Sequence, residues 1–251
     1  MLVRAMAGNL DLGPMTVVTL DKRQTDPVAG GFYTVSEAAR LLNIQNTGRI
    51  TGWLTGYKRS NAGPIIARQY KPISKIQEVG FWDLLEIRFV DHFRAQGVSL
   101  QTLRKAAEFA RQELNQHHPF ATSNVKFMTD RKEVFLKTAK ELKDNTLLNL
   151  VTKQYEMYVI LENVLARGIE FDPASGLAER WQPKPKEFPS IYLDPVFAYG
   201  QPIVKPAGVP TDAIFQAWKA ENGSYEAVSD WFELDRKLVQ EAVEFELGLP
   251  S

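Results

Sequence analysis

The chain has 251 residues, with 30 Lys and Arg against 30 Asp and Glu, three His and no Cys. A net charge of zero argues against a general nucleic-acid coat or a membrane-surface protein, and the lack of cysteine excludes disulfides, thiolate metal sites and cysteine nucleophiles. No stretch approaches the ~20 apolar residues of a membrane span, and the first 15 residues lack the apolar core of a secretory signal. We therefore expect a cytoplasmic protein with no membrane association, long enough for two small domains.

Residues 1–30 hold one candidate strand, at 15–20, followed by the turn-forming sequence TDPVAGG. We interpret them as a flexible arm ahead of the first folded unit.

Residues 34–56 carry the pattern of two short helices joined by a tight turn. Thr34, followed three residues later by Glu37, is typical of a capping box, and apolar residues then recur at helical spacing. Asn43 tolerates a left-handed backbone and can end this helix, while Asn46 or Thr47 can cap a second helix running to about residue 56. The pattern predicts a helix-turn-helix.

Positive charge is concentrated in the same region. Residues 36–71 contain six basic residues and one acidic residue, a local net charge of +5 in a neutral chain. Residues 58–63 are rich in turn formers and 65–70 alternate like a strand, so we expect a wing. In a helix-turn-helix the second helix enters the DNA major groove while basic neighbours bind phosphate. About five phosphate contacts would give log K a salt slope of roughly −4 to −5.

Within this segment we expect Arg49, Thr51 and Thr55 to be exposed, and Ile50 and Trp53 to turn inward. A helical hairpin with an ordinary solvated face is the alternative. The candidate DNA-binding residues are Ser36, Arg40, Arg49, Thr51, Thr55, Tyr57, Lys58, Arg59, Arg68 and Lys71.

Two longer helices follow, at residues 81–96 and, capped by Ser99, at 100–114. They exceed what a minimal DNA-binding unit needs. We expect their surplus apolar surface to pack against a second copy in a homodimer, or else within the same chain. With these helices, the first domain spans residues 31–116.

Residues 117–193 suggest a small mixed α/β module. His117 and His118 lack further ligands nearby in the sequence, so we interpret them as a loop pair, with no metal site. The period then changes, which predicts a β-hairpin at 125–138. A helix is expected at 153–167, then short apolar runs at 169–171, 177–181 and 191–193, with an exposed loop or stiff linker at 182–189.

The last domain, residues 194–251, begins with a proline-rich extended segment and continues with three predicted helices at 211–221, 224–232 and 235–247. From residue 205 onward there are four basic and nine acidic residues. If these three helices form a helix-turn-helix of their own, we expect the third to expose Glu241, Glu244 and Glu246. Phosphate would repel this surface, so a basic protein partner or a second subunit fits better. The candidate partner-binding residues are Trp218, Trp231, Phe232, Glu241 and Phe245.

No compact catalytic or phosphate-binding spacing occurs, so we expect neither an enzyme nor a cofactor. The overall expectation is an α+β protein, mainly α, with a three-helix unit at its end. A ligand-responsive regulator remains the alternative, with Tyr155, Tyr158 and Trp181 of the middle module around a small molecule.

Several segments together resemble a known family. They are YTVSEAARLL, FWDLLEIRFVDHFRAQGVSLQTLRKAAEFA, HPFATSNVKFMTDRKEVFL and, most specifically, GQPIVKPAGVPT followed by GSYEAVSDWFELDRKLVQEAVEFE. Over residues 31–247 the chain resembles VapB-type antitoxins of VapBC-like toxin–antitoxin modules. The resemblance implies a MerR-like winged helix-turn-helix and a C-terminal trihelical domain.

It further implies a non-enzymatic autorepressor that binds its own promoter and neutralises a PIN-like ribonuclease toxin. One departure concerns the second helix. Relatives often carry arginines before its tryptophan, where this chain has Thr51 and Gly52.

Overall fold

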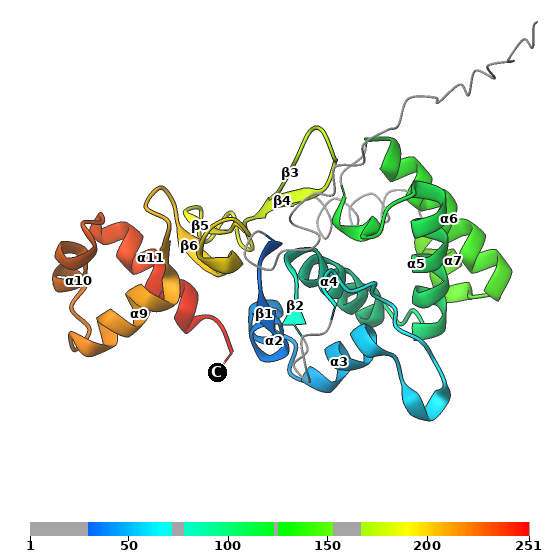
Figure 1. The fold of residues 1–251 in the computed structure, drawn as a ribbon, viewed down its shortest axis with the longest axis horizontal. Helices are drawn as coiled ribbons and strands as arrows, with labels where there is room; N and C mark the ends of the chain where they lie inside the picture. The colour runs from blue at the N-terminus through cyan, green and yellow to red at the C-terminus, as the bar shows by residue number, and fades with distance from the viewer. Residues whose placement is uncertain (1–29, 72–77, 123–124, 153–166, 251) are drawn as a thin grey trace, which may run out of the picture.

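The computed structural model describes residues 30–71, 78–122, 125–152 and 167–250, with the backbone alone at 59, 125–132 and 150–152. The expected arm (but for Gly30), its candidate strand and nearly all of the helix expected at 153–167 lie outside the described residues. The described chain is mixed α and β, mostly helical, with two small sheets. Helices α5 to α7 lie at one end and helices α9 to α11 at the other, with α4 and the strands β3 to β6 between them (Figure 1).

The first helix pair forms at its predicted positions, as α2 (Val35–Leu42) and α3 (Thr47–Thr55). The capping box is confirmed: Glu37 N donates to Thr34 Oγ1 at 3.1 Å, and Thr34 N donates to Glu37 Oε2 at 2.7 Å. Asn43 ends α2 with φ 54°, and the side chain of Asn46 caps α3 by accepting from Gly48 N. Local capping chemistry therefore sets both ends of the turn.

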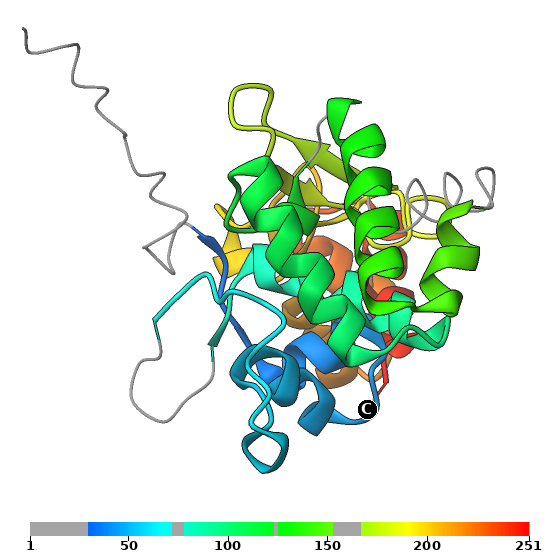
Figure 2. The same ribbon diagram turned by 90° about the vertical axis from the view of Figure 1, so that its right-hand side faces the viewer.

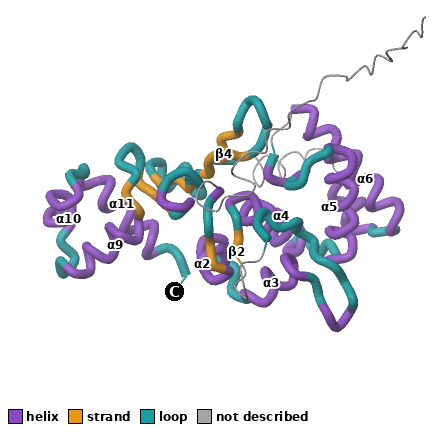
Figure 3. The backbone as a smooth tube through the Cα atoms, viewed as in Figure 1, coloured by secondary structure: helices purple, strands orange, loops and turns teal. Residues whose placement is uncertain are grey.

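The predicted wing strand at residues 65–70 is wrong. This stretch is loop (Figure 3), preceded by the 3-10 turn η2 (Lys58–Ser60). Ile65 and Ile66 are buried, and both backbone N–H groups donate to the carbonyl of Trp53 on α3. Two adjacent inward residues cannot both lie on one face of a strand. The short strand that does form, β2 (Glu78–Val79), pairs antiparallel with β1 (Tyr33–Thr34).

Helices α4 (Phe81–Ala95) and α5 (Leu100–Leu114) also match the prediction, and Ser99 caps α5. Their apolar faces are covered within the chain by η3 (Pro119–Ala121), α6 (Val125–Leu142) and α7 (Asn145–Thr152), which pack together in Figure 2. Phe89 stacks on Phe120 with centroids 3.9 Å apart, and Phe135 lies 5.4 Å from Phe93. The apolar faces of α4 and α5 thus pack within their own chain, which was the alternative to packing against a second copy. Homodimerisation remains a prediction.

The predicted β-hairpin at residues 125–138 is wrong, because the segment lies within one helix, α6. The buried residues Val134, Phe135, Thr138 and Ala139 recur at i, i+1, i+4 and i+5, which is a helical period. The backbone stays helical through Arg131 and Lys132, in the middle of the segment where a hairpin would have to turn.

A five-stranded antiparallel sheet follows, in the order β3 (Ile169–Phe171), β4 (Ala178–Trp181), β5 (Ile191–Leu193), β6 (Pro202–Val204) and β7 (Val209–Pro210). Ile191 pairs with Val204, and Leu193 pairs with Pro202. The sheet thus continues across residue 194, where we expected one module to end and the next to begin.

The three predicted C-terminal helices are confirmed as α9 (Thr211–Ala220), α10 (Tyr225–Phe232) and α11 (Arg236–Leu247), with Ser224 and Asp235 as side-chain caps. They enclose a core separate from the larger core around α4. Among the described helices, none has the length and apolar character needed to cross a membrane.

Candidate functional site

Part of the positive charge of the segment at residues 36–71 is already neutralised within the chain. Three of its six cations form ion pairs: Arg40 with Glu246 at 2.7 Å, Arg49 with Asp91 at 3.0 Å and Arg68 with Glu78 at 3.1 Å. Lys58 and Lys71 are exposed, and the side chain of Arg59 is outside the description. The positive electrostatic potential at the surface of this segment is therefore weaker than its net charge of +5 implies.

Arg68 does not lie along an exposed wing, and that expectation is wrong. Its side chain is 12% exposed and pairs with the buried carboxylate of Glu78. The same guanidinium donates to the Glu78 carbonyl at 2.9 Å. Arg68 therefore ties the described loop at residues 65–71 to β2, and a phosphate would have to displace a buried ion pair to reach it.

Helix α3 shows the orientation expected from its sequence, except at Thr51, which was expected to be exposed. Ile50 and Trp53 are buried, Arg49 and Thr55 are exposed, and Thr51 is half-buried. The Arg49 guanidinium lies 5.1 Å from the ring centroid of Trp53, and Thr55 Oγ1 donates back to the Thr51 carbonyl at 2.8 Å. On α2, Ser36 is exposed. Arg49 and Thr55 are thus the α3 side chains open to a ligand.

Gly52 has a packing role that explains the glycine in the middle of α3. A Cβ added at Gly52 would lie 2.4 Å from Cζ of Tyr57, so the Tyr57 ring occupies the space that a side chain at 52 would need. Tyr57 also forms a β-bridge with Ala62 across the turn. Tyr57, one of the candidate DNA contacts, is therefore half-buried against its own helix.

Two arginines of α5 hold the same loop, and sequence reasoning missed both. Arg104 Nε donates to the carbonyl of Gly63 at 2.8 Å, and Arg111 donates to the carbonyl of Ile65. They are seven residues apart and so share one face of the helix. That spacing was a usable signal for a basic stripe aimed at a neighbouring loop.

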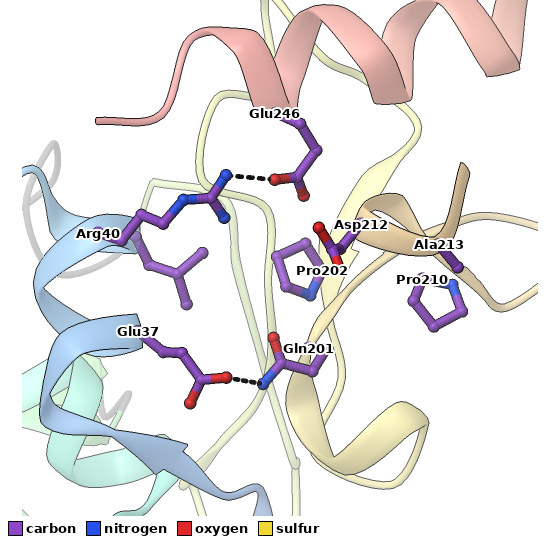
Figure 4. A pocket seen from close by; sticks show the side chains of 9 residues that line it. Glu37, Arg40, Gln201, Pro202, Pro210, Asp212, Ala213 and Glu246 are labelled. Carbon is purple, nitrogen blue, oxygen red and sulfur yellow. Dashed lines mark hydrogen bonds and ion pairs between the residues drawn. The ribbon is translucent and has the colours of Figure 1, made fainter. Parts of the chain in front are cut away.

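A cavity of about 490 Å³ separates α2 from the C-terminal helices (Figure 4). Arg40 crosses it to reach Glu246, whose second carboxylate oxygen accepts from Thr211 Oγ1. On the other wall Gln201 Nε2 donates to Glu37 at 3.4 Å. The cavity lining consists of Glu37, Arg40, Leu41, Gln201, Pro202, Pro210, Asp212, Ala213 and Glu246.

This arrangement overturns one expectation and revises another. Glu246, expected to be exposed, is buried, because α11 turns it toward α2. Arg40, expected to contact phosphate, already has a charged partner inside the chain. The two residues instead join the first helix pair to the C-terminal helices.

The five candidate partner-binding residues differ in how far they are exposed to solvent. Trp231 on α10 is 66% exposed, whereas Phe245 is buried in the C-terminal core, edge to face with Phe188. Trp218 and Phe232 are half-buried against that core. Glu241 accepts a hydrogen bond from the backbone N–H of Ser190 at 2.6 Å. Of the five, Trp231 is therefore the residue displayed openly to a partner.

Two buried carboxyl groups, of Asp83 and Glu86, lie beside His118 in the large core. His118 Nδ1 lies 3.6 Å from Glu86 and 3.8 Å from Asp83. Burial raises the pKa of Asp83 to about 6, opposed by His118 and by backbone N–H donors from Gly80 and Gln69. No group of His, Asp and Glu suited to hold a metal ion occurs among the described residues.

Comparison with known proteins gives a consistent but distant likeness. No protein-family model matches the chain. It is 26% identical over 214 residues to a protein of Mycobacterium tuberculosis (strain ATCC 25618 / H37Rv) described as "Putative antitoxin VapB45", covering 79% of this chain and 87% of that protein. The crystal structure of Rv2018 from Mycobacterium tuberculosis superposes with a TM-score of 0.62 at 21% identity, covering 84% of this chain and 96% of that one, so the fold is shared.

Proposed function

We propose that this chain is the antitoxin of a VapBC-like toxin–antitoxin module. The observation that carries the proposal is the similarity to a protein described as an antitoxin, because it extends over most of both chains instead of a single motif. The fold shared with a mycobacterial crystal structure, over 96% of that chain, supports the same arrangement of helices and strands. We also propose that the chain is not an enzyme and acts by binding alone.

DNA binding and autorepression form the second part of the proposal, with α2 and α3 acting as a MerR-like helix-turn-helix in a homodimer. Arg49 and Thr55 on α3, Ser36 on α2 and the exposed Lys58 and Lys71 support it, because they leave polar and positively charged side chains open to a ligand. Arg49 is exposed enough to exchange Asp91 for a phosphate at little cost, since surface ion pairs contribute only about 0–1 kcal/mol.

Neutralisation of a PIN-like ribonuclease is the third part. The C-terminal helices carry an excess of acidic residues, and the exposed Trp231 is close in the sequence to the exposed Glu226, Asp230 and Glu233. Exposed tryptophans are enriched among the residues that dominate binding energy, and acidic neighbours favour a basic partner. We assign toxin contact to this face of α10.

The direct test pairs the chain with the PIN-like ribonuclease that this proposal expects to be encoded beside its gene. We expect the two proteins to co-purify, the ribonuclease activity to be lost in the complex, and the chain to retard DNA from its own promoter in a salt-dependent manner. Active ribonuclease in the presence of excess chain would overturn the antitoxin assignment. Retention of toxin neutralisation without promoter binding would overturn only the autorepressor part.

The alternative of a ligand-responsive regulator has no supporting observation in the described part of the chain. Trp181 is buried, with the guanidinium of Arg88 5.1 Å from its ring centroid, so its face is already covered. Tyr155 and Tyr158 lie outside the described residues.

A further inference from the structure

The loop between β5 and β6 exposes three large apolar side chains close together in the sequence. Val196 is 64% exposed, Phe197 is 52% exposed and Tyr199 is 60% exposed. We name them the 196–199 surface. Phe197 also lines a cavity of about 240 Å³ whose other walls are Ile203, Pro206, Gly208 and the charged Arg180, Asp194 and Lys205. Apolar groups gathered in this way on a surface are typical of a contact site.

The backbone of this loop is held rigidly in the conformation that turns these side chains outward. The buried Asp194 accepts from Val196 N through its side chain and from Phe197 N through its carbonyl, both at 3.0 Å. Ala198 and Tyr199 have φ values of 46° and 55°, a region that side chains other than glycine rarely adopt. Such strain persists only where the surroundings impose it and is found most often at functional sites.

The start of the described chain lies directly on this loop. Phe32 N donates to the Tyr199 carbonyl at 2.8 Å, and Tyr33 Oη donates to the Gly200 carbonyl at 2.6 Å. A Cβ placed on Gly31 would lie 3.4 Å from Cβ of Pro195. Residues 1–29 therefore join the described structure beside the 196–199 surface.

From these contacts we infer that the apolar segment at residues 15–20, MTVVTL, docks on the 196–199 surface of the same chain. The roughly ten residues between this segment and Gly30 can span at most about 33–36 Å, and the surface begins within contact distance of Gly31 and Phe32. The tether holds the segment at a millimolar effective concentration, so weak intrinsic affinity is sufficient.

The size of the surface favours this occupant over a separate protein. A stable interface between two proteins takes about 800 Å² from each partner and some 20–30 residues a side. Three side chains and a small cavity fall well short of that area, whereas a short tethered segment matches them. The inference does not depend on the antitoxin proposal, and its test uses neither DNA nor toxin.

The absence of cysteine makes single-thiol labelling a clean test on the full chain. With Val196→Cys, we expect a maleimide to react about tenfold more slowly than in the same variant carrying Val17→Asp and Val18→Asp, because the docked segment shields the thiol only when it is apolar. Gln112→Cys, at an exposed position on α5, should react at one rate in both backgrounds and reports on any general unfolding.

Equal, fast labelling of Cys at 196 in both backgrounds would overturn the inference. A second pair, Tyr199→Cys with Val18→Cys, identifies the occupant by mild oxidation. An intramolecular cross-link that leaves the chain monomeric is the expected product. Cross-linked dimers, or shielding that appears only as protein concentration rises, would overturn it by assigning the surface to a second copy.

Discussion

The guanidinium of Arg40 on α2 lies 2.7 Å from a carboxylate oxygen of Glu246 on α11, and the two residues are 206 positions apart in the sequence. The side chain of Glu246 is 1% exposed, whereas that of Arg40 is 36% exposed. A carboxylate that is buried to this degree depends on its partner, because removing the partner leaves an uncompensated charge. The pair therefore couples the helix pair expected to bind DNA to the helices expected to bind toxin.

Replacing Arg40 with alanine should lower the free energy of unfolding by about 1.5–3 kcal/mol, the range for a hydrogen bond to a charged group. Urea denaturation measures it. Arg236→Ala is the control, since Arg236 and Glu226 form an exposed pair at 3.7 Å whose loss should cost no more than about 0.5 kcal/mol. Weaker promoter binding by Arg40→Ala at unchanged stability would instead assign Arg40 to the DNA.

The exposed Lys58 and Lys71 should account for part of the salt dependence of DNA binding. Each phosphate contact contributes about 0.9 to the slope of log K against log salt, so Lys58→Ala with Lys71→Ala should make the slope shallower by about 2. Fluorescence anisotropy between low and moderate salt measures this slope. Lys137→Ala on α6 should leave it unchanged, and an unchanged slope in the double variant would remove both lysines from the interface.

Trp231 and Phe245 should respond in opposite ways to truncation. Trp231→Ala should change the stability by no more than about 0.5 kcal/mol, because its side chain is exposed, yet weaken toxin binding by about 2 kcal/mol or more. Phe245→Ala should destabilise the fold by about 3–5 kcal/mol through the cavity it leaves. Calorimetric titration with the toxin, alongside thermal unfolding, separates the two. Full toxin affinity in Trp231→Ala would move the docking site elsewhere.

The buried carboxyl of Asp83 should make stability fall as pH rises from 4 to 6. Burial raises the pKa of Asp83 from 3.8 to about 6 in the folded chain, so between these values the folded state holds a proton that the unfolded state releases. The contribution is largest below pH 4, is lost as pH rises through 6 and is then constant. Its size is on the order of 2–3 kcal/mol.

This prediction is measured as the difference in unfolding free energy between the unmodified chain and Asp83→Asn at several pH values. The amide also loses one acceptor for Gln69 N or Gly80 N, but that cost does not depend on pH. A difference that stays flat from pH 4 to 6 would contradict a raised pKa.

Local chemistry made much of this fold predictable. The caps at Thr34, Asn46 and Ser99 act through groups within three residues, so their helix ends could be placed from the sequence alone. The partners of Arg40 and Arg68 could not, because each arginine looks like a solvated surface residue until the fold brings Glu246 or Glu78 beside it. Composition measures how much charge a segment has, whereas tertiary contacts decide how much of it remains available.

The prediction of a β-hairpin at residues 125–138 was wrong for a different reason. Its apolar residues are compatible with either a strand or a helix over short windows, and the choice depends on the aromatic cluster of Phe89, Phe93 and Phe120 that α6 covers. Covering these aromatic rings takes one face of a helix, so the neighbouring elements decide that this segment is helical. No local signal reports it.

The close contact between Gly52 and the ring of Tyr57 constrains how this chain can vary through evolution. A side chain at 52 would occupy the space that the far end of the Tyr57 ring now fills, so the ring would have to turn away from α3. Homologous sequences in which a ring at 57 packs in this way should therefore have glycine at 52. Chains with a longer residue at 52 should have either a small residue at 57 or a ring turned away from α3, and so a different packing of the loop against this helix.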